Sequence, residues 1–515
     1  MDADVIIAGA GPTGLMLAAD LRRAGVRPLV LERQPQRRQT PKASAFNGQI
    51  LELLRYRGLL DRVEAASGRP IGPAPSAPFG GMELDFSRLA DPPIQVAHLP
   101  QLQLERLLAD YAGELGADIR LGHAVTGVSQ DDATVTVEGH GPDGPYHLTA
   151  RYLVGCDGAH SRVRAAAGIP FPGVTYPEVN RLAQATVADS VTRRDDGDLD
   201  VPGLGRLRAG FTRTDRGVFG FGSLAAGTLL LQTTEDQPGR ADDDTPVTLD
   251  ELQASIRRVL GAELPLADVT RLSRYGFQAR QAARYRDGRI LLAGDAAHQF
   301  PATGIGINFG MLDAVNLAWK LAATIGGWAP AGLLGTYHDE RHFAGARALL
   351  QTQAQVALRR GQDPAAQALR ELFGELVADE QPLRRLGELI AGTSIRYPMP
   401  GPGPHPLAGT FAPDLRLDTG EGARTGAAAT SVAGLMAAAR PVLLDLADRP
   451  ELRAAAHGWR HRVDIHTAST DHRPADALLI RPDAYVAWAA AVGEPAGSAP
   501  DGLRAALATW FGPAS

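Results

Sequence analysis

The chain opens with Asp4-Val5-Ile6-Ile7-Ala8-Gly9-Ala10-Gly11-Pro12-Thr13-Gly14, an apolar run that leads into a glycine-rich turn. The run Val5 to Ala8 is typical of a buried parallel strand, and apolar residues recur at helical spacing after Gly14. In this pattern the first glycine permits the tight turn, the second lets the backbone approach a pyrophosphate, and the third lets the helix pack closely on the strand. The stretch therefore predicts a strand–turn–helix unit that binds a dinucleotide at the helix N-terminus.

A second apolar run extends this unit. Pro28 to Leu31 predicts another buried strand, and Glu32 follows it directly. A carboxylate at this position can accept hydrogen bonds from both hydroxyls of an adenosine ribose. We find one complete fingerprint of this kind in the chain, which argues against enzymes that hold two dinucleotides permanently.

Two later segments repeat the order of buried strand, turn and helix. Tyr152–Gly155 precedes Asp157-Gly158, and Ile290–Ala293 precedes Asp295. Ligands of open α/β sheets bind at the carboxyl ends of strands, where a carboxylate such as that of Asp295 can hold a sugar or ribityl hydroxyl. A glycine loop from Pro301 to Asn308 then leads into a predicted helix over residues 308–323, whose N-terminus offers a second anion site.

Composition excludes several classes of function. The chain has 515 residues, of which 44% are hydrophobic and 21% charged, which is ordinary for a globular enzyme of roughly two to four domains. A net charge of −6 gives no basic stripe for nucleic acid, and no apolar run reaches the ~20 residues that a membrane span needs. Cys156 is the only cysteine, so neither a disulfide framework nor a cysteine metal cluster is expected. Because the first strand begins almost at once, we expect no signal peptide. With a single cysteine, we also expect a cytoplasmic enzyme without a metal.

Loop-rich and proline-rich segments along the chain predict three regions. Alternating patterns such as Gly217–Ser223 predict a sheet between about residues 176 and 275, and we expect the loop-rich segment 71–99 to add strands to it. The run Pro398–Pro406 can neither continue a helix nor lie inside a sheet, so it predicts a linker to a terminal domain. The expected division is a nucleotide-binding domain of residues 1–70, 100–175 and 276–397, a substrate-binding sheet domain of residues 71–99 and 176–275, and a terminal domain of residues 405–515.

Together these motifs resemble those of the class A FAD-dependent aromatic hydroxylases of the p-hydroxybenzoate hydroxylase type. The three fingerprints of that family match Gly9-x-Gly11-x-x-Gly14, Asp157-Gly158-x-x-Ser161-x-x-Arg164 and Gly294-Asp295-Ala296-Ala297-His298. Within the family, the runs 313–322 and 337–341 and the tail with Arg481-Pro482-Asp483 resemble the aromatic-polyketide and rifampicin monooxygenases. The resemblance implies an α/β fold with a Rossmann-like FAD-binding domain, an inserted β-sheet substrate domain, and a C-terminal thioredoxin-like domain, here without cysteine.

The resemblance also assigns residues to a tightly but non-covalently bound FAD. Glu32 would hold the adenosine ribose, and Asp295 would hold the ribityl chain. The first turn of the helix after the glycine loop would present backbone N–H groups to the flavin, where its dipole stabilises the negative charge of the reduced ring. The expected cofactor-binding residues are Gly9, Gly11, Pro12, Thr13, Gly14, Glu32, Arg33, Lys42, Gln101, Val125, Asp157, Asp295, Pro301, Gly304, Gly306, Ile307 and Asn308, and the expected substrate contacts are Phe46, Phe221 and Gly222.

Two positions depart from the family pattern. Lys42 stands where relatives generally have an arginine near the pyrophosphate, which keeps the charge but loses bidentate binding. The glycine loop is one residue shorter than in relatives, because only Ile305 separates Gly304 from Gly306. Both changes bear on where the flavin ring sits.

The activity implied by the resemblance is an oxygenation. NADPH, a transient visitor, would reduce FAD, and O₂ would add to give a flavin C4a-hydroperoxide that hydroxylates a bound phenol or enol. Since the cofactor performs the difficult step, we assign no catalytic residue, and we expect His298 to be a positioning residue. The small and apolar residues Gly220, Phe221 and Gly222, in place of an arginine cluster, favour a polycyclic, polyketide-like aromatic substrate.

Three alternatives remain open from the sequence. The same scaffold could carry out Baeyer–Villiger insertion, or it could inactivate an antibiotic by oxygenation. The shortened glycine loop also leaves open a flavin-containing protein that binds and sequesters an aromatic compound with little turnover. We expect a monomer or a homodimer.

Overall fold

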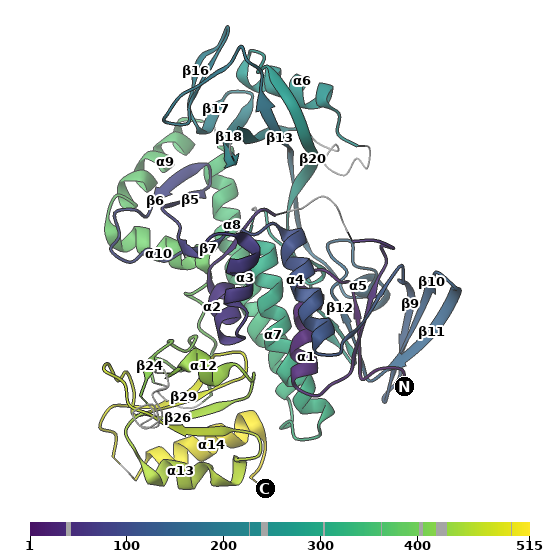
Figure 1. Cartoon of the computed structure of the whole chain (residues 1–515), viewed down its shortest axis with the longest axis vertical. Helices are drawn as coiled ribbons and strands as arrows, with labels where there is room; N and C mark the ends of the chain where they lie inside the picture. Colours follow the sequence, from purple (N-terminus) through teal and green to yellow (C-terminus); the bar gives the residue numbers. More distant parts are fainter. Residues whose placement is uncertain are drawn as a thin grey trace.

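The computed structural model describes residues 1–37, 43–225, 227–237, 246–301, 304–361, 363–400, 405–418, 430–495 and 497–514 (Figure 1). Its parts follow one another along the longest axis. A sheet that contains β13 (Gly173–Val187) and β20 (Leu266–Gln281) lies at one end, helices that include α1 (Pro12–Arg23) and α7 (Ile305–Ile325) lie in the middle, and the C-terminal part lies at the other end (Figure 1).

The nucleotide-binding region is built on a six-stranded sheet with the order β21-β22-β12-β1-β2-β8. Within it, β1 pairs in parallel with β2 and β12, β12 with β22, and β2 with β8, whereas β21 is antiparallel. Because parallel strands end at one edge, residues that follow three distant strands meet there. The strands are β1 (Val5–Ala8), β2 (Pro28–Glu32), β8 (Asp118–Leu121), β12 (Tyr152–Gly155), β21 (Arg286–Asp287) and β22 (Ile290–Leu292).

Helices α1, α7 and α4 (Gln101–Glu114) pack beside this sheet, with α1 in contact with both of the others. A Cβ atom on Gly14 would overlap the carbonyl oxygen of Gly9, which explains the third glycine of the fingerprint. The residues Val5, Ile6 and Ile7 are fully buried, as the apolar pattern predicted. The predicted strand, turn and helix are therefore confirmed.

The middle sheet has the order β17-β18-β19-β13-β20-β23 and is antiparallel throughout. Helix α6 (Leu249–Leu260) covers one of its faces, where its residues Leu252, Ile256 and Val259 share a core with the sheet. At the edge of the middle sheet, β20 pairs with β23 (His298–Gln299), which lies just after Asp295. This pairing joins the middle sheet to the carboxyl edge of the nucleotide-binding sheet. The other strands are β17 (Gly210–Thr214), β18 (Gly217–Ala225) and β19 (Thr228–Asp236).

The expectation that segment 71–99 adds strands to the middle sheet is wrong. In the described structure β4 (Gly72–Pro73) and β3 (Phe46–Asn47) pair with β7 (Gln95–Ala97), while β5 (Ser76–Phe79) pairs with β6 (Met82–Asp85). The hairpin of β5 and β6 is buried apart from the middle sheet, because its apolar side chains share a separate core with α8 (Thr336–Arg360) and α10 (Glu380–Ala391).

The C-terminal part contains a four-stranded mixed sheet with the order β27-β26-β28-β29. Strands β26 (Val442–Asp445) and β27 (Asp464–Thr467) are parallel, and β28 (Ala477–Ile480) is antiparallel to β26 and to β29 (Val486–Ala490). Helices α13 (Pro450–Ala456) and α14 (Ala499–Phe511) pack together, and α14 contacts β29. This arrangement is the thioredoxin-like domain that the sequence predicted.

The remaining elements are short helices and peripheral strands. Within the described ranges, no helix is long and apolar enough to span a bilayer. These elements are α2 (Gln49–Tyr56), α3 (Leu60–Ser67), β9 (Ala124–Gln130), β10 (Val135–Gly141), β11 (Gly144–Ala150), α5 (Arg162–Ala166), β14 (Thr192–Arg193), β15 (Leu199–Val201), β16 (Gly205–Leu207), the 3₁₀ turns η1 (Gly294–Ala296), η2 (Leu333–Gly335) and η3 (His457–Trp459), α9 (Pro364–Leu376), β24 (Arg416–Leu417), β25 (Thr430–Ser431) and α12 (Val432–Met436).

Candidate cofactor site

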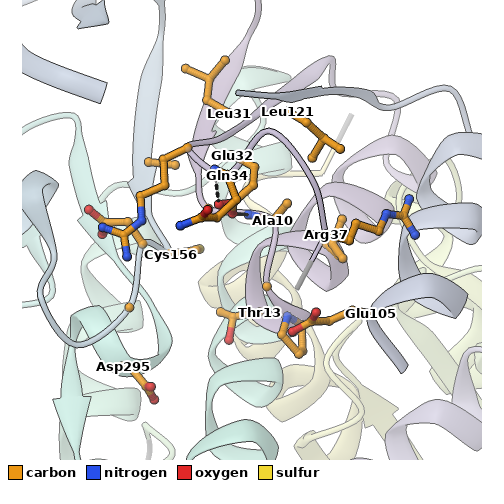
Figure 2. A pocket seen from close by; sticks show the side chains of 18 of the residues that line it. Ala10, Thr13, Leu31, Glu32, Gln34, Arg37, Glu105, Leu121, Cys156 and Asp295 are labelled. Atoms are coloured by element: carbon orange, nitrogen blue, oxygen red, sulfur yellow. Dashed lines mark hydrogen bonds between the residues drawn. The ribbon is translucent and has the colours of Figure 1, made fainter. Parts of the chain in front are cut away.

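A cavity of about 350 Å³ lies at the carboxyl edge of the nucleotide-binding sheet (Figure 2). Its walls come from the turn after β1, the end of β2, helix α4, and the start of α7. In Figure 2, Glu32 and Asp295 lie toward opposite ends of the view, with Thr13 between them. Of the residues predicted to bind the cofactor, those that line the cavity are Gly9, Gly11, Pro12, Thr13, Glu32, Arg33, Gln101, Val125, Asp157, Asp295, Gly304, Gly306 and Ile307.

The carboxylate of Glu32 is held in place by the backbone before any ligand binds. The N–H of Ala10 donates to Oε2 over 2.9 Å, and the N–H of Gln34 donates to Oε1 over 2.9 Å. Each carboxylate oxygen has a further lone pair, so Glu32 can still accept two hydroxyl hydrogen bonds. This geometry suits a ribose diol.

Asp157 also lines the cavity, and one of its two oxygens is paired within the protein while the other is not. Its Oδ2 accepts from the N–H groups of Arg162 at 2.7 Å and Val163 at 3.2 Å, at the start of α5. Its Oδ1 is buried and has no hydrogen-bond partner among the described residues. A buried acceptor without a partner costs about 1–3 kcal/mol, so this oxygen is suited to a donor supplied by a ligand or a water.

The opposite end of the cavity combines an exposed carboxylate with a helix N-terminus. Asp295 is exposed on the otherwise buried turn η1, and its Oδ1 would lie 3.2 Å from a Cβ atom built on Gly306. Gly304, in the left-handed region with a φ of 87°, precedes α7 and provides no side-chain cap. The first N–H groups of α7 therefore have no partner within the helix and can bind an anionic edge of a ligand.

The fully buried side chain of Asp313 holds the turn η1 in place. Asp313 Oδ2 accepts from the N–H of Gly294 at 2.9 Å and lies 2.7 Å from His298 Nε2, and its Oδ1 accepts from Arg341 Nε at 2.6 Å. Burial by itself raises the pKa of Asp313, but the charge of Arg341 and the contact with His298 lower it overall. His298 has no exposed surface, which agrees with the positioning role that the sequence indicated.

Other predicted residues lie outside the cavity wall. Gly14 and Pro301 are buried beside it, and Lys42 lies outside the described residues. Asn308 connects the start of α7 to β3, because its Nδ2 donates to Asn47 Oδ1 over 3.0 Å and its Oδ1 accepts from the N–H of Asn47 over 3.3 Å.

The structure corrects two of the three expected substrate contacts. Phe46 is 1% exposed in the core of the nucleotide-binding region. Phe221 is 5% exposed and lies on the face of the middle sheet that packs against α6. Neither ring is available to a substrate, whereas Gly222 lies on the opposite face, where an added Cβ would meet nothing within 4 Å.

Sequence reasoning missed several residues of the cavity. Arg37, Glu105, His123 and Arg162 all line it. Arg37 follows Glu32 closely and could have been found as a cation near the expected pyrophosphate. Glu105 could have been found from its spacing to Gln101 on α4, since Gln101 Nε2 donates to Glu105 Oε1 over 2.7 Å. Elsewhere, the described residues contain no cluster of three or more His, Cys, Asp or Glu side chains that could hold a metal ion.

Comparison with known proteins agrees with this site. The model of the FAD binding domain matches residues 2–352, and that of the aromatic-ring hydroxylase C-terminal region matches residues 405–514. A rifampicin monooxygenase of Streptomyces venezuelae is 37% identical over 99% of both chains, and a dialkyldecalin synthase of Streptomyces rugosporus is 38% identical over 100% of both. The structure of the anhydrotetracycline hydroxylase OxyS from Streptomyces rimosus matches with a TM-score of 0.87 and 40% identity over 100% of both chains. The chain therefore belongs to the FAD-dependent aromatic-ring hydroxylases and is a flavoprotein monooxygenase.

Proposed function

We propose that the protein hydroxylates a polycyclic, polyketide-like aromatic substrate with NADPH and O₂ as co-substrates. The observation that carries the proposal is the single cavity that joins a ribose-binding carboxylate, Glu32, to the uncapped N-terminus of α7. When bound there, FAD supplies the redox chemistry, because it accepts a hydride from NADPH and activates O₂. The residues of the chain bind and orient FAD and keep water from the reaction.

The proposed roles follow the order of the cavity. Glu32 binds the adenosine ribose, and the glycine turn with Arg33 and Arg37 faces the pyrophosphate. Asp295 binds the ribityl chain, and the N–H groups of Gly306 and Ile307 face the flavin ring. Because these groups form the positive end of the dipole of α7, they stabilise the negative charge that the reduced ring carries.

In this proposal NADPH is transient. We find no second dinucleotide fingerprint in the sequence, so reduction depends on an encounter that substrate binding can control. The cytoplasm, which supplies NADPH, is the proposed compartment, and a monomer or homodimer is the expected assembly. We also propose the division into an FAD-binding domain built on residues 1–70, 100–175 and 276–397, a substrate domain built on residues 176–275, and the terminal domain of residues 405–515. Segment 71–99 packs with α8 and α10 of the first of these.

A second candidate function is binding of an aromatic compound with little or no turnover. One observation favours it: the loop between Gly304 and Gly306 is short. Baeyer–Villiger insertion and oxygenation that inactivates an antibiotic stay within the first proposal, because each transfers one oxygen atom from O₂. The structure of the oxygenated product separates these outcomes.

The test is NADPH oxidation by the FAD-loaded full chain, with anhydrotetracycline, rifampicin and aklavinone as trial substrates. We expect slow oxidation alone and at least a tenfold increase with a suitable polycyclic phenol or enol. If every compound that binds leaves the oxidation rate unchanged and yields no oxygenated product, the hydroxylase proposal fails and the binding function replaces it.

A further inference from the structure

The middle sheet has one face that α6 does not cover. Arg181 Nε and Arg274 Nη1 donate to Glu251 of α6 at 2.8 Å and 2.9 Å, so these two arginines lie on the covered face. Side chains alternate along a strand, so Arg271 and Tyr275 of β20 point to the other side. We call this other side the open face and define it by Phe211, Gly220, Gly222, Arg271 and Tyr275.

The open face presents flat, apolar surface along β17 and β18. The ring of Phe211 is 47% exposed and lies against Gly220, where a Cβ atom would come within 2.8 Å of it. Gly222 pairs with Leu230, Leu230 with Gln184, and Gln184 with Arg271, so Gly222 and Arg271 lie in one row across the sheet. That row spans three strand spacings, or about 14 Å, which an extended ring system can cover.

The open face is connected to the cofactor site. Farther along β20, Phe277 packs under Arg359 of α8, whose guanidinium lies 4.2 Å from the ring centroid. The same strand ends in pairs with Gln299 and His298, a few residues after Asp295. A ligand on the open face is therefore bound by the strand that continues to the flavin end of the cavity.

Arg271 differs from the arginines that lie on the covered face and on α6. Arg181 and Arg274 pair with Glu251, and Arg258 pairs with Glu235. Arg271 is half-buried, its Nε is buried without a hydrogen-bond partner, and it pairs with no carboxylate among the described residues. Burial lowers the pKa of Arg271, and among the described residues Tyr275 opposes this effect. A guanidinium removed from water without an acidic partner is unfavourable, and an anionic ligand would offset the cost.

Tyr275, four residues farther along β20 and on the same face, adds a neutral donor within electrostatic range of this charge. Its hydroxyl is buried and has no hydrogen-bond partner among the described residues. Burial raises the pKa of Tyr275 to about 12 despite the nearby Arg359 and Arg271, so the phenol keeps its proton at neutral pH.

We propose that Arg271, with Tyr275 beside it, recognises the ionised oxygen of an acidic phenol or enol on the substrate, while the rings lie toward Phe211 and Gly222. This inference rests on the proposed function and adds to it a substrate class, polycyclic compounds that carry an ionised ring oxygen. Ionisation also raises the electron density of the ring, which favours attack by an electrophilic oxygen.

The test measures binding to the FAD-loaded, oxidised full chain at pH 7 by the change in flavin absorbance. The probes are 2-hydroxy-1,4-naphthoquinone, which is ionised at this pH, and 2-methoxy-1,4-naphthoquinone, which is not. We expect the protein to bind the hydroxy probe at least tenfold more tightly, since a charge-assisted hydrogen bond corresponds to about ten- to hundredfold in affinity. Arg271→Gln should remove this preference, Arg271→Lys should retain part of it, and Tyr275→Phe should reduce it a few-fold.

Arg216→Gln is the matched control. Arg216 is exposed in the same region and pairs with its neighbour Asp215, so its loss should not alter the preference. The inference is overturned if the unaltered protein shows no preference or binds neither probe, or if Arg271→Gln retains the preference with its flavin spectrum intact. A failure of the proposed function would look different: the probe preference would persist while no trial substrate is oxygenated.

Discussion

The cofactor site and the contact between the C-terminal domain and the nucleotide-binding region treat polar groups in opposite ways. At the cofactor site, Asp157 Oδ1 is unpartnered and the start of α7 is uncapped. At the domain contact, Lys320 Nζ of α7 donates to Glu340 Oε2 of α8 over 2.7 Å, and Arg481 after β28 donates to the same carboxylate over 2.8 Å. The charged groups at the domain contact are thus paired, although the indole N–H groups of Trp319 and Trp510 there are buried without a partner among the described residues. At the cofactor site, by contrast, a carboxylate oxygen and the start of a helix are left for a ligand.

The domain contact is a network of buried, hydrogen-bonded side chains. Arg481 is fully buried, donates to Asp483 over 3.0 Å, and lies 4.5 Å from the ring of Trp510. Asn316 Nδ2 of α7 also donates to Asp483, over 2.8 Å. The terminal domain follows a proline-rich stretch in the sequence. Even so, its buried side chains Arg481 and Asp483 form hydrogen bonds with side chains of α8 and α7. Removing one partner should therefore cost far more here than at the cofactor site.

The largest effect is expected from Glu340→Ala. The change leaves Lys320 and Arg481 buried without their shared acid, and loss of one partner from such a group costs about 3–5 kcal/mol. Urea unfolding followed by tryptophan fluorescence measures this loss. Glu380→Ala, at the exposed start of α10, is the control, and a loss from Glu340→Ala that is no larger than the control's would contradict the contrast between the two regions.

A smaller effect, confined to the cofactor, is expected from Asp295→Ala. Loss of charge-assisted hydrogen bonds to the ribityl chain should weaken FAD binding by about 1.5–3 kcal/mol, roughly ten- to hundredfold, with little change in the unfolding of the apoprotein. FAD titration of the apoprotein tests this, with Asp91→Ala on an exposed loop as the control. Unchanged FAD affinity would remove Asp295 from the site.

Glu32→Gln should weaken FAD binding by less, about tenfold. The amide oxygen retains one acceptor for the N–H of Ala10 or Gln34, but the charge that strengthens both ribose hydrogen bonds is lost. The position oxidised on the substrate should not change, because we propose that Glu32 binds the adenosine end of FAD, away from the flavin ring. A change in the product, measured by NMR spectroscopy, would show that this assignment of the two ends is incorrect.

The smallest effect concerns pH. The charges of Arg481 and Lys320 outweigh burial and lower the pKa of Glu340 below its usual 4.5. A depressed carboxyl pKa contributes stability above the unfolded value, and that stability is lost as the pH falls toward the folded value. Between pH 7 and pH 4 the contribution of Glu340 should therefore fall by about 1 kcal/mol. The free energy of unfolding, measured in urea at both pH values, should fall by this amount less in Glu340→Gln than in the unaltered protein. Equal decreases in the two proteins would contradict the paired state of the carboxylate.

The cofactor site could be predicted because its residues follow short local patterns. Glu32 comes directly after an apolar run and Asp295 comes two residues after another, and parallel pairing places the ends of such runs together. The helix expected over residues 308–323 begins earlier, at Ile305, because the left-handed Gly304 ends the loop there. The predicted position of Lys42 near the pyrophosphate stays a prediction.

The domain contact and the open face could not be predicted in the same way. Glu340 and Arg481 are 141 positions apart, and no local pattern indicates that they share a buried site. Phe221 was assigned to the substrate because alternation shows which residues share a face but not which face α6 covers. For the same reason, Arg271 has no sequence signal that separates it from the paired arginines around it.

Transfer of one oxygen atom from O₂ to an aromatic substrate can be followed by incubating the FAD-loaded chain with NADPH, ¹⁸O₂ and anhydrotetracycline, and by measuring the mass of the product. We expect a product that carries one ¹⁸O atom and forms only when NADPH is present. Tight binding of the substrate with no label in any product would show that the protein is not the proposed hydroxylase.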